Sequence, residues 1–383
     1  MKIAILTTDN RAHLGTYRET MPWFAAGHGS LHKGFATLPD LEVHVISCTQ
    51  QPMQSPQKIA GNIWFHSLHV PKIGWLRTLY QGCIRATRRK ISEINPDIVH
   101  GHGTERDCAI SAILSGYPNV LTVHGNMGEM ARLHCARFGD YYWLTAWLEN
   151  FTLRRTLGVF CNSRYTQSLV QPRARKTWLV PHALRMEFFE PPPGASVRPP
   201  VLLNAGVITP RKRQLELLDV AEKLHRRGLK FELRFIGFIY SHSDPYVRAF
   251  LERIKPMEAA SYVRFLGMQP DSELVHCYDS VAGVVHFPTE EAFGNVVVES
   301  LSRELKFFGS RLGGIVDIAT GAPGAELFAQ DDWDGLTNAI ARWIEQGCPR
   351  PTGAAALMRE RYHPTVIARR HLEIYREVLK TRS

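Results

Sequence analysis

Short runs of apolar, often β-branched residues alternate with longer amphipathic stretches along almost the whole chain. Such alternation predicts β-α-β units and a parallel sheet. Several runs are apolar at every position, as strands covered by helices on both faces require. In the first half the expected strands are residues 2–7, 42–48, 63–66, 98–102, 120–124, 159–162 and 177–181. In the second half they are residues 201–205, 232–236, 262–265, 283–287 and 306–309.

A proline-rich segment interrupts this alternation once. Residues 190–200 read Glu-Pro-Pro-Pro-Gly-Ala-Ser-Val-Arg-Pro-Pro, which continues neither a helix nor a central strand. A chain of 383 residues is long enough for two domains. We therefore expect two doubly wound α/β domains. The expected boundaries are 1–190 for the first domain, 191–200 for a linker, 201–362 for the second domain and 363–383 for a last helix.

Positive charge is concentrated in the first half of the chain. Residues 1–200 hold 22 Lys and Arg against 13 Asp and Glu, whereas residues 201–383 hold 24 against 23. A basic half suggests an anionic partner, either a nucleic acid or a membrane surface. We expect no nucleic-acid partner, because this half shows no helix-turn-helix pattern, no zinc spacing and no aromatic stacking platform.

The basic residues are densest in residues 72–90. Residues 43–92 contain no Asp or Glu, and residues 73–90 mix apolar and cationic side chains at near-helical spacing within an expected helix over 76–94. This pattern is typical of a helix on an anionic bilayer, where each exposed cation contributes about 1 kcal/mol. It is equally typical of an amphipathic helix that packs on its own sheet and exposes a basic face.

The cysteines and the N-terminal segment favour a cytoplasmic chain. Seven cysteines without CxxC spacing indicate reduced thiols rather than a disulfide scaffold or a zinc ribbon. Residues 1–11 lack the apolar stretch of a secretory signal, and no segment reaches the roughly 18 apolar residues of a membrane span. We expect a cytoplasmic protein, peripheral on the inner face of the membrane where residues 72–90 bind lipid.

One strand-to-helix connection in the second half carries two acidic residues and a glycine. Residues 286–299 read His-Phe-Pro-Thr-Glu-Glu-Ala-Phe-Gly-Asn-Val-Val-Val-Glu, with Gly294 at the expected helix start between Glu291 and Glu299. Doubly wound sheets bind ligands where strands lead into helices. Unpaired amides at Gly294 and Asn295 favour an anion, and the flanking carboxylates suit the hydroxyls of a nucleotide sugar. The alternative is an acid that complements the helix dipole, followed by an ordinary helix glutamate.

The segment from Glu291 to Glu299 resembles the E-x-F-G-x-x-x-x-E signature of the retaining family-4 glycosyltransferases of GT-B architecture. Segments similar to further motifs of that family follow in its order at residues 96–102, 121–125, 162–163, 180–183, 205–212, 263–278 and 313–317. The resemblance implies two Rossmann-like domains facing across a cleft, the first binding an acceptor and the second a nucleotide-sugar donor. It also implies transfer of a hexose-type sugar to a saccharide or lipid-linked saccharide, with retention of anomeric configuration, in polysaccharide or glycolipid biosynthesis.

The resemblance also implies residue roles. Glu291 would hold hydroxyls of the transferred sugar, Lys212 would neutralise the diphosphate leaving group, and His124 would face the donor sugar from the first domain. A reaction that expels a nucleoside diphosphate requires positive groups where that charge develops. Glu299 would hold the ribose, and the backbone of residues 265–267 would meet the nucleobase. The complete expected donor set is Gly206, Arg211, Lys212, Phe265, Leu266, Gly267, Glu291, Phe293, Gly294, Asn295 and Glu299.

The chain departs from the family pattern on the donor side. Val207 stands where the family has an arginine after Gly206. Arg211 or Arg213 would have to supply that charge from a different backbone position.

The acceptor side shows a second departure. The glycine pair that the family carries after the first strand is absent from residues 7–16. We expect Gly27 and Gly29 to represent it, at the end of a longer loop and before a helix over 30–38. The expected acceptor-side residues are Gly27, Gly29, His102, Gly125 and Asn126.

We expect neither a metal nor a cofactor. His100 and His102 have no carboxylate or cysteine at ligand spacing, so a strand-end pair that lines the cleft is the better interpretation. Residues 331–334 contain D-x-D, but acids at the start of an expected helix over 333–346 need no metal. No G-x-G-x-x-G follows a strand, which argues against a dinucleotide-dependent oxidoreductase.

The expected function is therefore a metal-independent glycosyltransferase. One alternative is a catalytically weak or inactive relative that binds carbohydrate or nucleotide. A less favoured alternative is a basic nucleic-acid-binding protein.

Overall fold

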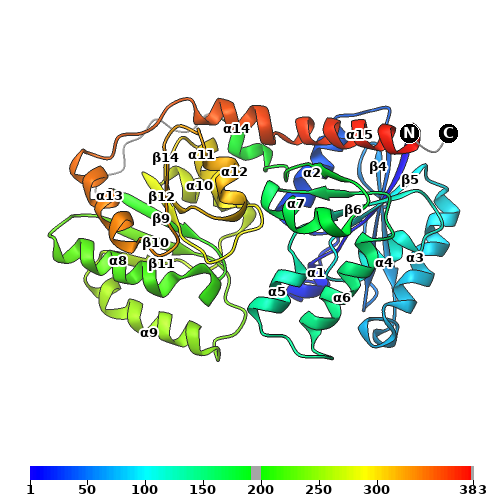
Figure 1. Cartoon of the computed structure of the whole chain (residues 1–383), viewed down its shortest axis with the longest axis horizontal. Helices are drawn as coiled ribbons and strands as arrows, with labels where there is room; N and C mark the ends of the chain where they lie inside the picture. The colour runs from blue at the N-terminus through cyan, green and yellow to red at the C-terminus, as the bar shows by residue number, and fades with distance from the viewer. Residues whose placement is uncertain (191–199, 381–383) are drawn as a thin grey trace. The chain divides into compact units, whose positions relative to one another are not determined.

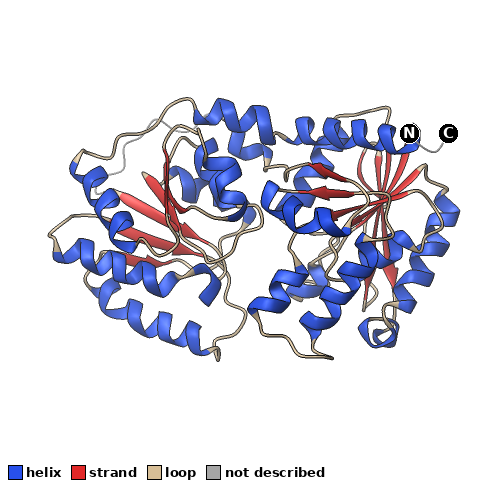
Figure 2. Ribbon diagram, viewed as in Figure 1, coloured by secondary structure: helices blue, strands red, loops and turns tan. Residues whose placement is uncertain are grey.

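Figure 1 shows a computed structural model of the chain, in which residues 1–190 and 200–380 are described. The chain divides into two compact units, residues 1–185 with 362–383, and residues 186–361. Each unit is built on one sheet with helices on both faces (Figure 2). Of the expected linker over 191–200, residues 191–199 lie outside the described residues.

The first unit contains an eight-stranded sheet in the order β3-β4-β2-β1-β5-β6-β7-β8. All neighbouring strands are parallel except β3 and β4. The strands are β1 (Lys2–Leu6), β2 (Glu42–Thr49), β3 (Lys58–Ala60), β4 (Ile63–His69), β5 (Ile98–His102), β6 (Asn119–Val123), β7 (Val159–Cys161) and β8 (Thr177–Leu179). The helices are α1 (Arg11–Leu14), α2 (Ala26–Ala36), α3 (Gln81–Ile94), α4 (Asp107–Ile113), α5 (Met127–Leu133), α6 (Tyr141–Leu153), α7 (Arg164–Val170) and α15 (Pro364–Lys380).

Alternate residues of β1 feed the cores on the two faces of this sheet. Ile3 and Ile5 pack in one core with residues of α2 and α15, whereas Ala4 and Leu6 pack in the other with residues of α3 and α4. The period of two follows from strand geometry, and both sets are apolar because both faces are covered.

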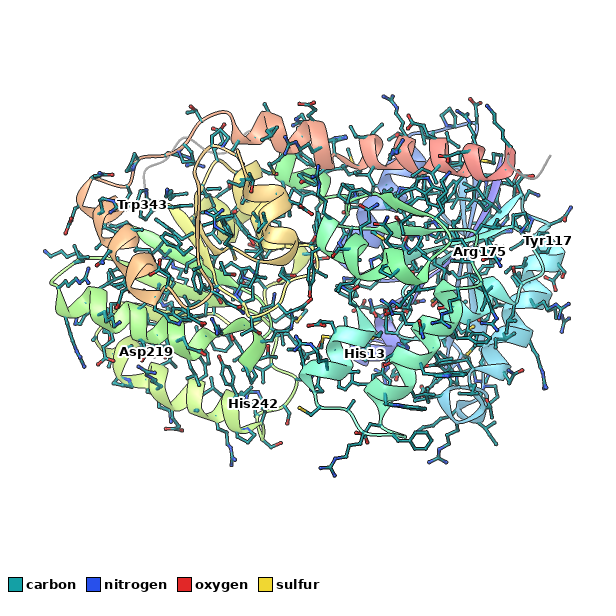
Figure 3. The ribbon with its side chains drawn as sticks, in the orientation of Figure 1. His13, Tyr117, Arg175, Asp219, His242 and Trp343 are labelled. Atoms are coloured by element: carbon teal, nitrogen blue, oxygen red, sulfur yellow. The ribbon has the colours of Figure 1, made fainter. Side chains whose placement is uncertain are left out.

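The second unit contains a six-stranded, fully parallel sheet in the order β11-β10-β9-β12-β13-β14. The strands are β9 (Val201–Ala205), β10 (Glu232–Ile236), β11 (Val263–Phe265), β12 (Gly283–His286), β13 (Lys306–Ser310) and β14 (Ala325–Phe328). The helices are α8 (Gln214–Arg226), α9 (Pro245–Ala259), α10 (Asp271–Asp279), α11 (Asn295–Ser302), α12 (Gly313–Ala319), α13 (Trp333–Glu345) and α14 (Ala354–Tyr362). Trp343, labelled on α13 in Figure 3, packs on Phe308 of β13 with ring centroids 5.6 Å apart.

All expected strands form, and the structure adds β3 and β14, two short strands at sheet edges. The expected helix over 76–94 was wrong at its start. Residues 72–78 form two 3-10 turns, and α3 begins only at Gln81. The break lies at Leu79 and Tyr80, whose φ angles of 50° and 63° are incompatible with a right-handed helix.

The structure shows where the apolar face of α3, within the basic segment, packs. Cys83, Ile84 and Ile91 of α3 are buried in the cores of their own unit, whereas Arg85 and Arg88 are exposed. The apolar face of α3 is therefore occupied within the protein. Among residues 1–190 and 200–380, no helix combines the length and the apolar character that crossing a membrane needs.

Candidate functional site

Strand order reverses once in the second unit, at β9, which lies between β10 and β12. A ligand crevice forms at such a reversal, outside the carboxyl ends of the strands. Gly206 and Lys212 follow β9, and Glu290 and Glu291 follow β12. The expected phosphate and sugar residues therefore stand on the two connections that border this position.

Lys212, Glu291 and His286 form one bonded cluster at this position. The Lys212 Nζ atom donates to the Glu291 Oε2 atom at 2.5 Å. The Nε2 atom of His286, the last residue of β12, lies 3.1 Å from the same oxygen and 3.5 Å from Lys212 Nζ. Because a carboxylate only accepts, His286 carries its proton on Nε2.

The charges in this cluster follow from burial and pairing. Burial by itself raises the pKa of the Glu291 carboxyl, but the Lys212 ammonium and the hydrogen bond from His286 bring that pKa well below its usual value. Burial, together with the charge of Lys212, lowers the pKa of His286 to about 4. At neutral pH the cluster is therefore an ammonium, a carboxylate and a neutral imidazole.

The two connections are tied together by Arg211. Its Nη1 atom donates to the Glu290 carbonyl at 2.9 Å and lies 3.3 Å from Glu290 Oε2, while Thr289 N donates to the Arg211 carbonyl at 2.8 Å. Arg213 binds Asp331 at 3.0 Å and the Gln330 carbonyl at 2.6 Å. Both arginines that we considered as substitutes for the missing one at Val207 thus have partners on other segments.

Glycines allow the connections to approach one another. Gly294 has a φ of 106° and stands immediately before α11, which begins at Asn295. A Cβ atom at Gly314 would lie 2.4 Å from the Phe293 carbonyl oxygen, and Gly314 N donates to the Glu291 carbonyl at 2.9 Å. The signature segment therefore packs directly against the start of α12.

The remaining expected donor residues belong to the same unit. The Glu299 side chain is buried on α11, where its Oε2 atom accepts a hydrogen bond of 2.6 Å from the Tyr278 hydroxyl. Phe265 ends the edge strand β11, and Gly267 accepts a hydrogen bond from Gly237 N at 2.9 Å. The assignment of Glu299 to the ribose and of residues 265–267 to the base stays a prediction.

The reversal in the first unit lies at β1, between β2 and β5, and histidines gather there. His102 is the last residue of β5, His124 follows β6, and His28 lies in the first turn of α2. The Nε2 atoms of His28 and His124 are 2.6 Å apart. The other ring nitrogen of His124 lies 2.9 Å from His182 Nε2.

These histidines are neutral. Burial, together with neighbouring histidines, lowers the pKa of His28 to about 3 and brings the pKa values of His102 and His124 well below the usual value. The site formed by these rings is therefore an uncharged hydrogen-bonding surface, unlike the cluster of the second unit.

The expectation for Gly27 and Gly29 was wrong in one respect. Both lie inside α2, which starts at Ala26, and not in a loop before a helix over 30–38. A Cβ atom at Gly27 would lie 3.2 Å from the His182 ring, so Gly27 permits a close approach of α2 to that ring. The loop that precedes α2 is instead held by the buried ion pair of Arg11 and Asp9, 2.6 Å apart.

Two expected acceptor-side residues have unsatisfied polar atoms. Among the described residues, neither ring nitrogen of His102 and neither amide atom of Asn126 has a hydrogen-bond partner, although both side chains are buried. Asn126 precedes α5, directly after Gly125. Buried polar groups are nearly always satisfied, so these atoms indicate a position for water or a polar ligand.

Sequence reasoning missed His286, Glu290, His28 and His182. His286 closes an expected strand just before the acidic signature, and His28 stands between the two glycines that we singled out. Their positions were therefore visible, but their contacts were not. Only the folded chain shows that His28 meets His124 and that His286 meets Lys212, both from distant segments, and that His286 also bonds to Glu291 five residues further on.

Comparison with known proteins identifies both units. Residues 186–359 match the model of the glycosyl transferases group 1, and residues 31–186 match that of glycosyltransferase family 4. Curated protein sequences yield no match.

Solved structures show the same fold at low identity. Sucrose-phosphate synthase from Thermosynechococcus elongatus is 16% identical, with a TM-score of 0.77 over 100% of each chain. Anabaena HepE in complex with UDP and glucose is 16% identical, with a TM-score of 0.71 over 98% of this chain and 99% of HepE. The lipopolysaccharide outer core galactosyltransferase WaaB is 14% identical, with a TM-score of 0.67 over 100% of each chain. With family models matching both units, the chain belongs to the family-4, group 1 glycosyltransferases and has the GT-B fold.

Proposed function

We propose that this glycosyltransferase moves a hexose-type sugar from a nucleoside-diphosphate sugar to a saccharide or lipid-linked saccharide, with retention of the anomeric configuration. The observation that carries the proposal is the cluster of Lys212, Glu291 and His286 at the strand reversal of the second unit. It combines a positive group for a diphosphate with an ionised acceptor for sugar hydroxyls.

The cluster suits an exchange of partners when the donor binds. Without donor, Lys212 and Glu291 neutralise each other across 2.5 Å. A bound diphosphate becomes the new partner of the Lys212 ammonium, and the sugar hydroxyls donate to the released carboxylate of Glu291. His286 continues to orient that carboxylate through its own hydrogen bond of 3.1 Å.

The chemical step breaks the bond between the anomeric carbon and the diphosphate oxygen and forms a bond from that carbon to a hydroxyl oxygen of the acceptor, whose proton passes to the leaving diphosphate. Negative charge then develops on the leaving diphosphate, where Lys212 and the amides at the start of α11 stabilise it. These groups supply positive charge without a metal ion, so we propose a metal-independent reaction. HepE was solved with UDP and glucose, which makes UDP-glucose the first donor to test.

The acceptor is proposed to bind in the first unit. His124 offers a neutral imidazole, and the buried amide of Asn126 has no described partner for its donor or its acceptor. Both properties suit the uncharged hydroxyls of a saccharide. A carboxylate-rich site would be expected instead if the acceptor were cationic.

A binding protein without transfer activity is the second candidate. It is favoured by Val207, because Arg211 and Arg213 bind Glu290 and Asp331 rather than supplying the charge that is lost there. The two candidates agree on donor binding and differ in turnover.

A thermal-shift screen against UDP-, GDP- and ADP-hexoses tests the donor site. A donor at a hundred times its Kd stabilises the folded chain by about 2.7 kcal/mol, which raises the melting temperature. The shift is expected to fall by about half or more in Lys212→Met and to keep its full size in Lys223→Met, because Lys223 pairs with Asp334 at the exposed surface of the same unit. A donor shift of full size in Lys212→Met would contradict the proposal. Release of nucleoside diphosphate in the presence of acceptor then separates the transferase from the binding protein.

A further inference from the structure

We propose that His28, His102 and His124 bind one divalent transition-metal ion of the Zn²⁺ class in the first unit. One ring nitrogen from each of these residues lies within 4.8 Å of the other two. Three histidines that converge from α2, β5 and the connection after β6 resemble the His₃ ligand set of zinc sites that keep a fourth position open.

In two of these histidines, the ring nitrogen that would not face the metal already has a hydrogen-bond partner, as is usual for metal-binding histidines. A metal-binding histidine usually bonds through its second ring nitrogen to a neighbouring group, which fixes the ring. His28 Nδ1 lies 2.9 Å from the Thr7 hydroxyl, and His124 Nδ1 lies 2.9 Å from His182 Nε2. The Nε2 atoms of His28 and His124 consequently point toward one another.

A bound ion would replace the contact between these two Nε2 atoms. They are 2.6 Å apart and share one proton. Zinc–nitrogen bonds are about 2.0–2.1 Å long, so the rings must separate modestly to hold an ion between them. The ring that carries the shared proton must change to the tautomer protonated on Nδ1, where the proton meets Thr7 Oγ1 or His182 Nε2. Each Nε2 atom then contributes its lone pair to the metal, and both rings stay neutral.

His102 supplies the independent evidence for a ligand. Its side chain is only 4% exposed, and neither ring nitrogen has a hydrogen-bond partner among the described residues. Its ring centroid lies 5.0 Å from that of His28 and 5.6 Å from that of His124. Burying a polar group without a partner costs about 1–3 kcal/mol, and coordination of a metal removes this cost.

The ligand type selects the class of metal. Neutral imidazoles suit Zn²⁺, Co²⁺, Ni²⁺ or Cu²⁺, whereas Mg²⁺ and Ca²⁺ require oxygen ligands.

The proposed site bears on regulation of the reaction, a consequence that rests on the proposed function. The ion would occupy His124, which we propose as part of the acceptor site. Metal binding and acceptor binding would then exclude one another, and Zn²⁺ would inhibit turnover without weakening the nucleotide site of the second unit.

Metal titration of the untagged full-length chain tests the site without any donor or acceptor. We expect one Co²⁺ per chain, with the visible absorption bands of tetrahedral cobalt, and displacement of Co²⁺ by Zn²⁺ in calorimetry. His102→Phe keeps a ring of similar size and removes no described hydrogen bond, so it is expected to fold and to bind about tenfold more weakly or worse. Thr7→Val removes only the outer bond to His28, and such losses weaken metal sites by about 10–100-fold.

Two exposed histidines provide matched controls. His13 and His242, labelled in Figure 3, lie outside the cluster, and their replacement by alanine should leave the stoichiometry and affinity unchanged. Absence of saturable binding, or binding that survives both His102→Phe and Thr7→Val, would overturn the proposal. Failure of the donor screen alone would not contradict the proposed metal site, because the metal titration involves no nucleotide.

Discussion

The two units place side chains at the same position of the same kind of sheet, yet the two sites differ in charge. In the first unit, His102 ends β5 and His124 follows β6, both on one side of the reversal at β1, and the rings are neutral. In the second unit, Lys212 and Glu291 follow the strands that border the reversal at β9, and both are ionised. The fold thus fixes where a ligand binds, and the side chains at that position determine which kind of ligand binds.

The net charge of each half of the chain would predict the opposite assignment, with the charged site in the first half and the uncharged site in the second. Residues 1–200 carry a surplus of nine positive charges (22 against 13), but their strand-end cluster is uncharged. Residues 201–383 are almost balanced (24 against 23), yet they hold the lysine proposed to meet a diphosphate. Overall charge describes the solvated surface, where Arg85 and Arg88 lie, rather than the ligand site.

The largest expected difference between the units is their response to acid. The pKa of His28 is lowered to about 3, and those of His32 and His371 to about 4, so these residues stay neutral in the folded first unit. Below about pH 6.5 these histidines become protonated in the unfolded chain but not in the folded unit. The free energy of unfolding therefore falls as the pH falls. Each such histidine costs about 1.4 kcal/mol per pH unit, or about 4 kcal/mol for three at pH 5.5.

Hydrogen exchange resolved by peptide measures this difference. Between pH 7.5 and 5.5, after correction for intrinsic rates, amides of β5 and β6 should lose more protection than those of β12. The second unit has one comparable histidine, His286, and the lowered pKa of Glu291 affects stability only below about pH 4.5. Equal loss of protection in both units would contradict the expected difference in their response to acid.

Glu291→Gln should produce the next largest effect, on turnover. The amide retains the shape of the carboxylate but loses the charge that accepts sugar hydroxyls and pairs with Lys212. Loss of one preorganised electrostatic group typically lowers turnover by about a hundredfold to a thousandfold. Release of nucleoside diphosphate measures it. The matched control is Glu222→Gln on α8, a half-buried glutamate that pairs with Arg226 and Arg253. Activity within about threefold of the unmodified chain would exclude an electrostatic role for Glu291 of this size.

Lys212→Met should have a smaller effect, on stability. It leaves the Glu291 carboxylate, which is only 15% exposed, without its ion-pair partner and with the hydrogen bond from His286. Breaking a fully buried pair costs about 3–5 kcal/mol, so we expect about 2 kcal/mol for this partly exposed one. Urea unfolding measures the loss, and Lys212→Met combined with Glu291→Met should recover part of it. A double variant that loses the sum of both single effects would show that the two charges are not coupled.

The sequence was most informative where one local pattern decides the structure. Unbroken apolar runs located the strands. Gly294 located the start of α11, because the position just before this helix has a φ of 106°, which glycine adopts readily. The start of α3 was not predictable, because Leu79 and Tyr80 adopt positive φ angles that neither residue type favours. Tyr80 is buried in the fold, and this packing overrides the local pattern.

The candidate site was predictable only in part, for a related reason. A family resemblance pointed to Lys212 and Glu291, and the structure places their side chains in contact. The contact of His28 with His124 joins residues 96 apart in sequence, and that of His286 with Lys212 joins residues 74 apart, so no local spacing encodes them. His286 and Glu291 are only five residues apart, but their contact depends on the course of the connection after β12.

On this proposal, the second unit alone binds the nucleoside diphosphate. Calorimetry with the nucleoside diphosphate of the accepted donor tests this claim most directly. This ligand carries the phosphates but no sugar, so its affinity should depend on Lys212 and not on His124. The account predicts a Kd raised about tenfold or more in Lys212→Met, equivalent to about 1.4 kcal/mol, and an unchanged Kd in His124→Phe. An unchanged Kd in Lys212→Met, or an equal loss of affinity in His124→Phe, would contradict it.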